Sequence, residues 1–132
     1  MSLESARHRA RLWLRQAQDD LRAARLLQQG GQAAQACFLA QQVGKKAIKA
    51  LLAAEDRDLR SHSLMALLRE LDETHAQCWQ RQARVLDKLY APTRYPDALG
   101  DELPADVFGP EDGATALQAA KELLDWASDQ LP

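Results

Sequence analysis

The stretch Gln32–Ala54, QAAQACFLAQQVGKKAIKALLAA, combines good helix formers with one continuous stripe of small and apolar side chains. The members of the stripe recur every three or four residues: Ala33, Cys37, Ala40, Gly44, Ala47 and Leu51. Larger apolar side chains, Phe38, Ile48 and Leu52, lie close to it. Small side chains let a neighbouring helix approach closely. We therefore expect this stretch to be the central helix of a bundle.

A second amphipathic helix is predicted before this stretch, over about Glu4–Gln29. Its apolar positions again recur at helical spacing: Ala10, Trp13, Leu14, Ala17, Leu21, Ala24 and Leu27. Gly30 and Gly31 follow at once, and glycine readily adopts the left-handed conformation that helix ends often need. The pair is therefore expected to form the turn between the two helices.

After the central helix, Glu55–Ser61 is polar apart from one leucine and reads as a loop. Ser61 or Ser63 could cap a following helix, since a short hydroxyl side chain satisfies a free backbone N–H. The leucines of Leu64–Leu71 then predict a short amphipathic helix.

The apolar pattern continues after a kink expected at Asp72–His75, through Trp79, Ala83, Leu86, Leu89 and Tyr90, until Pro92 ends it. Residues 92–110 contain four prolines and no periodicity, so they are expected to form a long loop.

A last helix is predicted to begin at Asp112 or Thr115. Its buried face would consist of Leu117, Ala120, Leu123, Leu124, Ala127 and Leu131. No strand-like run or internal repeat is present. The chain is therefore expected to be all-α, an antiparallel up-and-down four-helix bundle with an additional short helix, and residues 1–132 to form a single domain.

Charge is unevenly distributed, although the formal net charge is only −2. Residues 1–25 carry six arginines against three acidic residues, whereas the chain from Asp97 onward carries nine acidic residues and one base, Lys121. Such an asymmetry fits a basic binding face, but solvated charges or complementary helix surfaces are its more common cause.

Two cysteines, Cys37 and Cys78, lie within apolar helical patterns and are expected to be small buried side chains. Neither a disulfide framework nor a metal site is predicted, and no cofactor. The N-terminus is charged and lacks the apolar segment of a signal peptide, and no apolar run is long enough to span a bilayer. We therefore expect a cytoplasmic location and no membrane partner.

Five segments together carry a resemblance to a known family. They are, in chain order, ACFLAQQ at 36–42, KAIKALL at 46–52, HSL at 62–64, LDKLY at 86–90 and PTRYPD at 92–97. In their order and spacing they resemble the HEPN domain of prokaryotes, over about residues 9–130. The Arg-Tyr-Pro-Asp element after an aromatic helix end is the most specific part.

The resemblance implies an up-and-down helical bundle that is often a homodimer. Many members of the family are encoded beside a small nucleotidyltransferase and act with it as a two-component system, in several cases toxin and antitoxin. Some members bind nucleotides, and others are metal-independent ribonucleases. This chain is therefore expected to be a binding module for a nucleotide or an RNA phosphate that partners a small nucleotidyltransferase.

The ribonuclease branch of the family uses a late arginine followed about five to seven positions later by a histidine. Here Arg94 occupies that part of the chain, and no histidine follows it. The expectation is therefore against an enzyme. A metal-independent endoribonuclease using His62 with Arg57 or Arg60 stays open as an alternative, because imidazole can move a proton while a guanidinium steadies phosphate.

The segment Tyr90–Asp97 is the first candidate ligand site. Pro92 and Pro96 restrict the backbone on either side of Arg94, which offers a planar fork for a phosphate or carboxylate. Tyr90 and Tyr95 could stack on a base, and Asp97 belongs to the same element. The structural alternative is that Arg94 pairs with Asp97 or with an acidic residue of the last helix.

Lys46 and Lys49 form a second candidate, because two ammonium groups on neighbouring parts of a helix can hold a phosphate. The alternative is that their stems cover the core. His62 could contact a phosphate or base, or hydrogen-bond across the loop before its helix. A third function, a purely structural dimerisation partner, also stays open, because the Gln32–Ala54 helix is apolar around much of its circumference.

Overall fold

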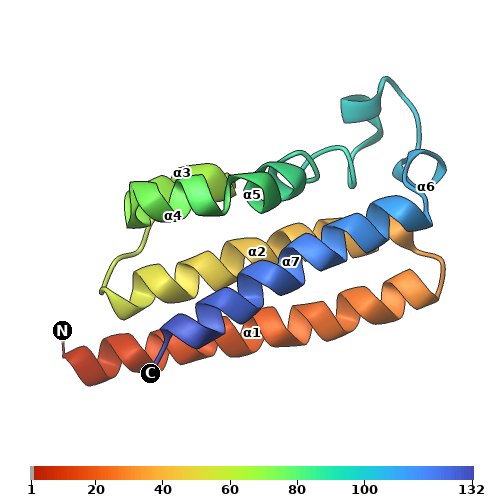
Figure 1. Ribbon diagram of the computed structural model, residues 1–132. Helices are drawn as coiled ribbons and strands as arrows, with labels where there is room; N and C mark the ends of the chain where they lie inside the picture. Colours follow the sequence, from red (N-terminus) through yellow and green to blue (C-terminus); the bar gives the residue numbers. More distant parts are fainter. Residues whose placement is uncertain (1) are drawn as a thin grey trace.

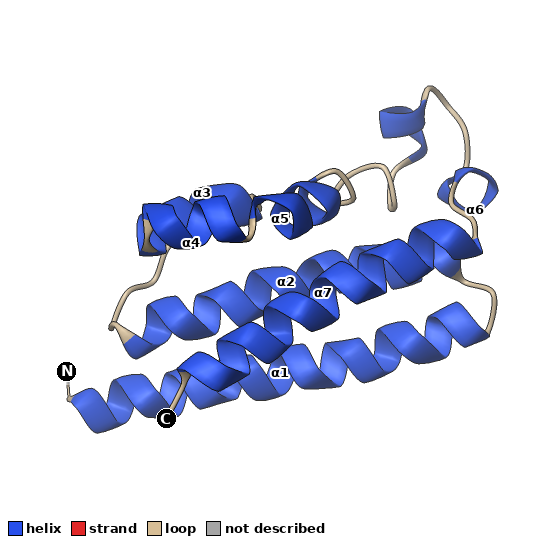
Figure 2. Ribbon diagram, viewed as in Figure 1, coloured by secondary structure: helices blue, strands red, loops and turns tan. Residues whose placement is uncertain are grey.

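Four antiparallel helical segments form the bundle in a computed structural model that describes residues 2–132. The three long helices are α1 (Leu3–Gln29), α2 (Ala33–Ala54) and α7 (Pro110–Gln130). Figure 1 shows that the chain runs up, down, up and down, with both termini at one end of the bundle. The described part of the chain contains no strand, and Figure 2 shows helices joined by loops. The predicted all-α bundle is confirmed.

The third segment of the bundle is a row of three short helices, α3 (Leu64–Leu71), α4 (Glu73–Cys78) and α5 (Gln80–Asp87). Ser63 caps α3 by accepting from the Ala66 amide at 3.1 Å. Asp72 has extended backbone and caps α4 through the amides of Thr74 and His75, which is why the segment breaks at the expected kink.

Helix α2 is central, as its sequence predicts, because it contacts α1, α3, α5 and α7. Gly44 lies where leucines of three other helices converge. A Cβ atom there would come within 2.7 Å of both Leu64 Cδ2 and Leu86 Cδ1, and within 3.4 Å of Leu123 Cδ1. The absence of a side chain at Gly44 therefore lets α3 and α5 approach α2 closely.

The glycine turn between α1 and α2 forms as expected. Gly31 adopts a left-handed conformation with φ of 80°, and the amide of Gln32 bonds the carbonyl of Leu27 at 2.8 Å. This turn sets α2 antiparallel to α1.

The connection from α5 to α7 differs from the prediction. The short helices η1 (Pro96–Leu99) and α6 (Pro104–Val107) interrupt the expected loop, each with a proline in its first turn. Helix α5 ends at Asp87, before Pro92. The last helix begins at Pro110, earlier than expected, because proline fits the first position of a helix and the Asp112 carboxylate accepts from the Gly109 amide at 2.8 Å.

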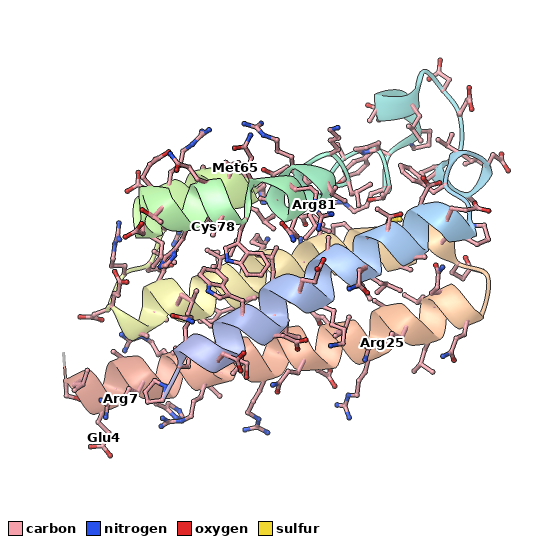
Figure 3. All side chains as sticks on the ribbon, in the orientation of Figure 1. Glu4, Arg7, Arg25, Met65, Cys78 and Arg81 are labelled. Carbon is pink, nitrogen blue, oxygen red and sulfur yellow. The ribbon has the colours of Figure 1, made fainter. Side chains whose placement is uncertain are left out.

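The two cysteines have different surroundings, so the expectation that both are buried is wrong for Cys78. Cys37 is fully buried on α2, and burial, together with the charge of Asp112, raises the pKa of its thiol to about 11. Cys78, on α4, is exposed (Figure 3).

No helix within residues 2–132 is both long and apolar enough to cross a membrane.

Candidate functional site

The turn after α5 places Arg94 among three aromatic rings. Its guanidinium carbon lies 4.4 Å from the ring centre of Tyr90, 4.5 Å from that of Phe38 and 4.8 Å from that of Tyr95. Tyr90 and Tyr95 flank Arg94 in sequence, whereas Phe38 comes from α2. Attraction between a cation and the faces of these rings favours this position of the guanidinium.

Backbone contacts fix the same turn. Arg94 Nε donates to the carbonyl of Tyr90 at 3.2 Å, and the amides of Arg94 and Tyr95 both bond the carbonyl of Ala91 at 3.1 Å. The hydroxyl of the buried Thr93 donates to the carbonyl of Leu89. Arg94 is therefore held in place by its own turn.

Arg94 is half-buried and carries no salt bridge to any carboxylate in residues 2–132. The expected structural alternative, pairing with Asp97 or with an acidic residue of the last helix, is not what the structure shows. Asp97 lies exposed on η1 without a hydrogen bond or ion pair to Arg94. Within the described chain the two Nη groups of Arg94 are left without a hydrogen bond, and they are therefore available to an anion.

His62 joins the same cluster from the loop before α3. Its ring stacks on Tyr90 with a centroid distance of 4.2 Å, and its Nε2 lies 3.2 Å from the Tyr90 hydroxyl oxygen. The fully buried Gln41 of α2 donates to the His62 carbonyl at 3.1 Å. His62 thus bonds across the loop, and its exposed ring borders the arginine site.

Asp87, the last residue of α5, holds the beginning of α3 beside the turn. Its carboxylate accepts from the amides of Leu64 at 2.6 Å and Met65 at 3.2 Å, and from the hydroxyl of Ser63 at 3.2 Å. These bonds satisfy free amides of a helix N-terminus. Asp87 therefore fixes His62 relative to Tyr90, a role that its position in the sequence did not reveal.

Lys45 is a further cation of the site that sequence reasoning did not select. It lies on α2, seven residues after Phe38, and it is half-buried. Burial lowers the pKa of its ammonium below the ordinary value of 10.5, and the nearby charges of Lys49, Lys46 and Arg94 lower that pKa further. The spacing of Phe38 and Lys45, two helical turns apart, is the sequence signal that could have found it.

The two predicted lysines have different surroundings. Lys46 forms an ion pair with Asp20 of α1 at 2.6 Å, and the Asp20 side chain is only 12% exposed and also accepts from Gln16. Lys49 instead lies 5.3 Å from the ring centre of Trp13 and has no carboxylate partner in residues 2–132. We therefore leave Lys46 out of the candidate site.

The residues of the ribonuclease alternative do not converge. Arg57 donates to the carbonyl of Glu70 at 2.6 Å and pairs with the carboxylates of Glu55 and Glu70, and Arg60 is exposed. Neither arginine is joined to His62 by a hydrogen bond or ring contact within the described residues. The endoribonuclease hypothesis stays a prediction.

The arginines of the basic N-terminal segment spread along α1, as Arg7 and Arg25 near its two ends illustrate (Figure 3). A hollow of about 790 Å³ lies between α1 and α7. Its charges are mixed, since Arg22 pairs with Asp19, and Lys121 with Asp125 at 2.6 Å. Arg15 and Arg25 also line the hollow and form no ion pair within residues 2–132, so only part of its positive charge is neutralised.

No group of three or more His, Cys, Asp or Glu side chains within residues 2–132 is arranged to hold a metal ion.

The protein is therefore an all-helical up-and-down bundle in which aromatic rings hold an arginine beside the central helix. The HEPN domain family model matches residues 10–130. The chain belongs to the HEPN domain family.

Solved structures agree with this assignment. The crystal structure of TT1696 from Thermus thermophilus shares 38% identity at a TM-score of 0.88, covering 93% of this chain and 98% of that one. The structure of ST0689, described as an archaeal HEPN homologue, shares 33% identity at a TM-score of 0.79, with the same two coverages of 93% and 98%. A HEPN domain protein from Thermotoga maritima, tm0613, shares the fold at 24% identity and a TM-score of 0.71, covering 90% of this chain and 96% of that one. A comparison with curated proteins finds no match.

Proposed function

We propose that this HEPN domain is a binding module that holds the phosphate of a nucleotide or of RNA at Arg94. The proposal rests on one observation. Three aromatic rings hold the Arg94 guanidinium, and this guanidinium has no carboxylate partner in the described chain. A guanidinium in this state offers parallel N–H donors whose geometry matches a phosphate.

Two neighbours of Arg94 support an anionic ligand that carries a base. Lys45 contributes a second positive charge; burial, and after it the charges of three neighbouring cations, lowers its pKa, and a phosphate would offset those charges. Tyr95 is 48% exposed, so its ring is available for a base to stack on. His62, on the far side of the same cluster, borders the site through Tyr90.

Titration calorimetry with adenosine 5′-monophosphate (AMP) tests the proposal. A hydrogen bond to a charged group contributes about 1.5–3 kcal/mol, so Arg94→Gln should weaken AMP binding by about 10- to 100-fold. Arg94→Lys keeps the charge but loses the fork, and it should recover only part of the affinity. Lys121→Gln, on an exposed pair of α7, serves as the control and should bind AMP normally.

The fold of each variant is verified by its thermal unfolding. Unchanged AMP affinity in folded Arg94→Gln would contradict the proposal, as would the absence of AMP binding by the wild-type chain.

The proposal extends to the partners that the family resemblance implies: a second copy of the chain, and a small nucleotidyltransferase with which the domain forms a two-component, toxin–antitoxin-like system in the cytoplasm. Affinity purification of the tagged chain from its native host, followed by mass spectrometry, tests the second partner. Analytical ultracentrifugation tests the first. A monomer at micromolar concentration, or repeated purification without a nucleotidyltransferase, would remove the corresponding part of the proposal.

A further inference from the structure

One face of α2 continues from the arginine site toward the other end of the helix. Phe38, Gln42, Lys45 and Lys49 recur at spacings of three and four residues and are all half-buried, and together we call them the α2 strip. The strip begins at the ring that contacts Arg94 and ends at the ammonium that contacts Trp13. At 1.5 Å per residue it is about 16 Å long.

The cations along the α2 strip lack anionic partners. Arg94, Lys45 and Lys49 form no ion pair with any carboxylate of residues 2–132, whereas the neighbouring Lys46 is neutralised by Asp20. Burial is the main cause of the lowered pKa of Lys45, and the charges of Lys49, Lys46 and Arg94 lower that pKa further, so Lys45 is within electrostatic reach of cations at both ends of the strip. A row of unneutralised charges of one sign is complementary to a polyanion.

Aromatic surface is available at both ends of the row. Tyr95 is exposed at the Arg94 end. At the other end Trp13, from α1, borders two hollows. One, of about 270 Å³, is also lined by Lys49, Arg57 and the carboxylate-bearing Asp58, and the other, of about 260 Å³, by Leu12 and Gln16. Trp13 therefore has space beside it that a planar group can enter.

We propose that the α2 strip, with Arg94 and Tyr95 at one end and Trp13 at the other, binds a short single strand of nucleic acid rather than a mononucleotide alone. Cations that follow the backbone and aromatic rings on which bases stack are the two features that single-strand sites combine. At about 3.4 Å per nucleotide in a stacked strand, 16 Å accommodates up to about five nucleotides. This inference rests on the proposed function, since the Arg94 site holds the first phosphate.

Fluorescence anisotropy with labelled oligoadenylates of one to six nucleotides tests the inference. Affinity should rise with length up to four or five nucleotides and then level off. For the tetranucleotide, the logarithm of the association constant should fall with the logarithm of the salt concentration with a slope of about −2. Each of three single-strand phosphate contacts contributes about −0.7 to this slope.

Two variants, each with a matched control, test whether the Trp13 end of the strip takes part in binding. Lys49→Gln should reduce the salt slope for the tetranucleotide by about 0.7 and remove most of the gain in affinity with length, whereas Lys121→Gln should change neither. Trp13→Leu should cost the tetranucleotide about fivefold or more in affinity, because base stacking is worth about 1–3 kcal/mol. Trp126→Leu is its control, since Trp126 packs against Trp79 and His75 away from the strip.

The outcomes separate this inference from the proposed function. Arg94-dependent binding of AMP whose affinity does not rise with chain length would overturn the strip and leave the Arg94 site intact. Length-dependent binding that Lys49→Gln and Trp13→Leu leave unchanged would overturn the strip as well. A failure of every oligoadenylate and of AMP to bind would overturn both.

Discussion

Lys46 and Lys49 are three residues apart on α2, and their surroundings give them different roles. Lys46 has its ammonium 2.6 Å from the nearly buried carboxylate of Asp20, whereas Lys49 lies over Trp13 with no anion of the described chain beside it. A cation that is already paired in the interior contributes to stability, and an unpaired one at the surface is available to a ligand.

We expect Lys46→Met to lower the free energy of unfolding by about 2 kcal/mol, because it leaves the Asp20 carboxylate without its counter-charge. Gln16, which still bonds Asp20, keeps the cost below that of a fully buried pair. Urea unfolding measures the loss. The double variant Asp20→Leu with Lys46→Met removes both charges and should recover part of the stability. AMP affinity should change less than twofold in Lys46→Met, and a tenfold loss would show that Lys46 belongs to the binding site.

We expect anion binding at the proposed site to depend on pH through Lys45. Burial and three neighbouring cations lower its pKa in the free protein, whereas a bound phosphate favours the charged ammonium and raises that pKa again. Between the pKa of Lys45 in the free protein and its higher pKa in the complex, binding takes up protons. AMP affinity should therefore fall as pH rises through the lowered pKa, before ordinary lysines titrate near 10.5.

Titrations between pH 7 and 10 in wild type and Lys45→Gln measure this dependence. The lower limit lies above the second phosphate pKa of about 6, so the ligand keeps its charge throughout. The variant should bind more weakly with a flatter pH profile. An equal decline in both proteins would show that another group is responsible.

The contact between the end of α5 and the beginning of α3 positions the candidate site. The Asp87 carboxylate accepts three hydrogen bonds from Ser63, Leu64 and Met65, so the C-terminus of α5 holds the N-terminus of α3. The segment on one side of this junction carries His62, and the segment on the other side carries Tyr90.

Asp87→Ala should destabilise the protein by about 2 kcal/mol, since hydrogen bonds to a charged group contribute about 1.5–3 kcal/mol and a helix cap about 1. Denaturant unfolding measures the change. Asp125→Ala, which removes an exposed carboxylate paired with Lys121, is the control and should cost about 0.5 kcal/mol or less. Equal losses in the two variants would contradict a special role of the Asp87 junction.

The glycines of α2 and α7 provide a matched pair for testing helix packing. Gly44→Ala puts a methyl group 2.7 Å from carbon atoms of Leu64 and Leu86, and overpacking of this kind costs about 1–3 kcal/mol. The gain in helix propensity, about 1 kcal/mol, offsets part of that cost. We therefore expect a net loss of about 1–2 kcal/mol in thermal or denaturant unfolding.

Gly113→Ala should be nearly neutral. The nearest atoms belong to the flexible Gln28 side chain, whose amide oxygen is buried without a hydrogen-bond partner in the described chain. Moving that side chain costs little beyond its bond to the Pro110 carbonyl at 2.8 Å. If Gly44→Ala is as neutral as Gly113→Ala, then the close approach of α3 and α5 to α2 does not depend on Gly44.

Most of the helical elements follow from local sequence signals. The three- and four-residue spacing of apolar side chains predicts α1, α2 and α3, and Gly31 and Ser63 end or cap helices as their chemistry implies. The segment before α7 was less predictable, because η1 and α6 are single turns that begin at prolines and bury no side chain. Periodicity cannot reveal helices of four residues.

In the whole molecule, the sequence predicts those parts of the candidate site whose residues are neighbours in the chain. It does not predict the contacts between residues of different helices. Arg94, Tyr90 and Tyr95 are neighbours in sequence, and the structure keeps them together. Phe38 and Lys45 come from α2, and only the packing of the turn after α5 against α2 brings them to Arg94. Likewise, no local pattern distinguishes Lys46 from Lys49, because the difference lies in α1.

We infer that the proposed ligand binds along α2 beside the turn after α5, and not in the larger hollow between α1 and α7. The Arg94 site lies at the turn after α5, against Phe38 of α2, whereas the larger hollow is lined by α1 and α7. The aromatic rings and the backbone bond that hold Arg94 while its Nη groups have no partner in the described chain, not the size of the hollow, are the basis for this choice.

Nuclear magnetic resonance spectra of the ¹⁵N-labelled chain, recorded during a titration with AMP, test that claim most directly. We expect saturable shifts of the Arg94 Nε–H signal and of the backbone amides of Phe38, Lys45 and Tyr95, with the signals of Arg22 and Lys121 unchanged. Shifts confined to Arg22, Lys121 and their neighbours between α1 and α7, or no saturable shift at Arg94, would contradict the account.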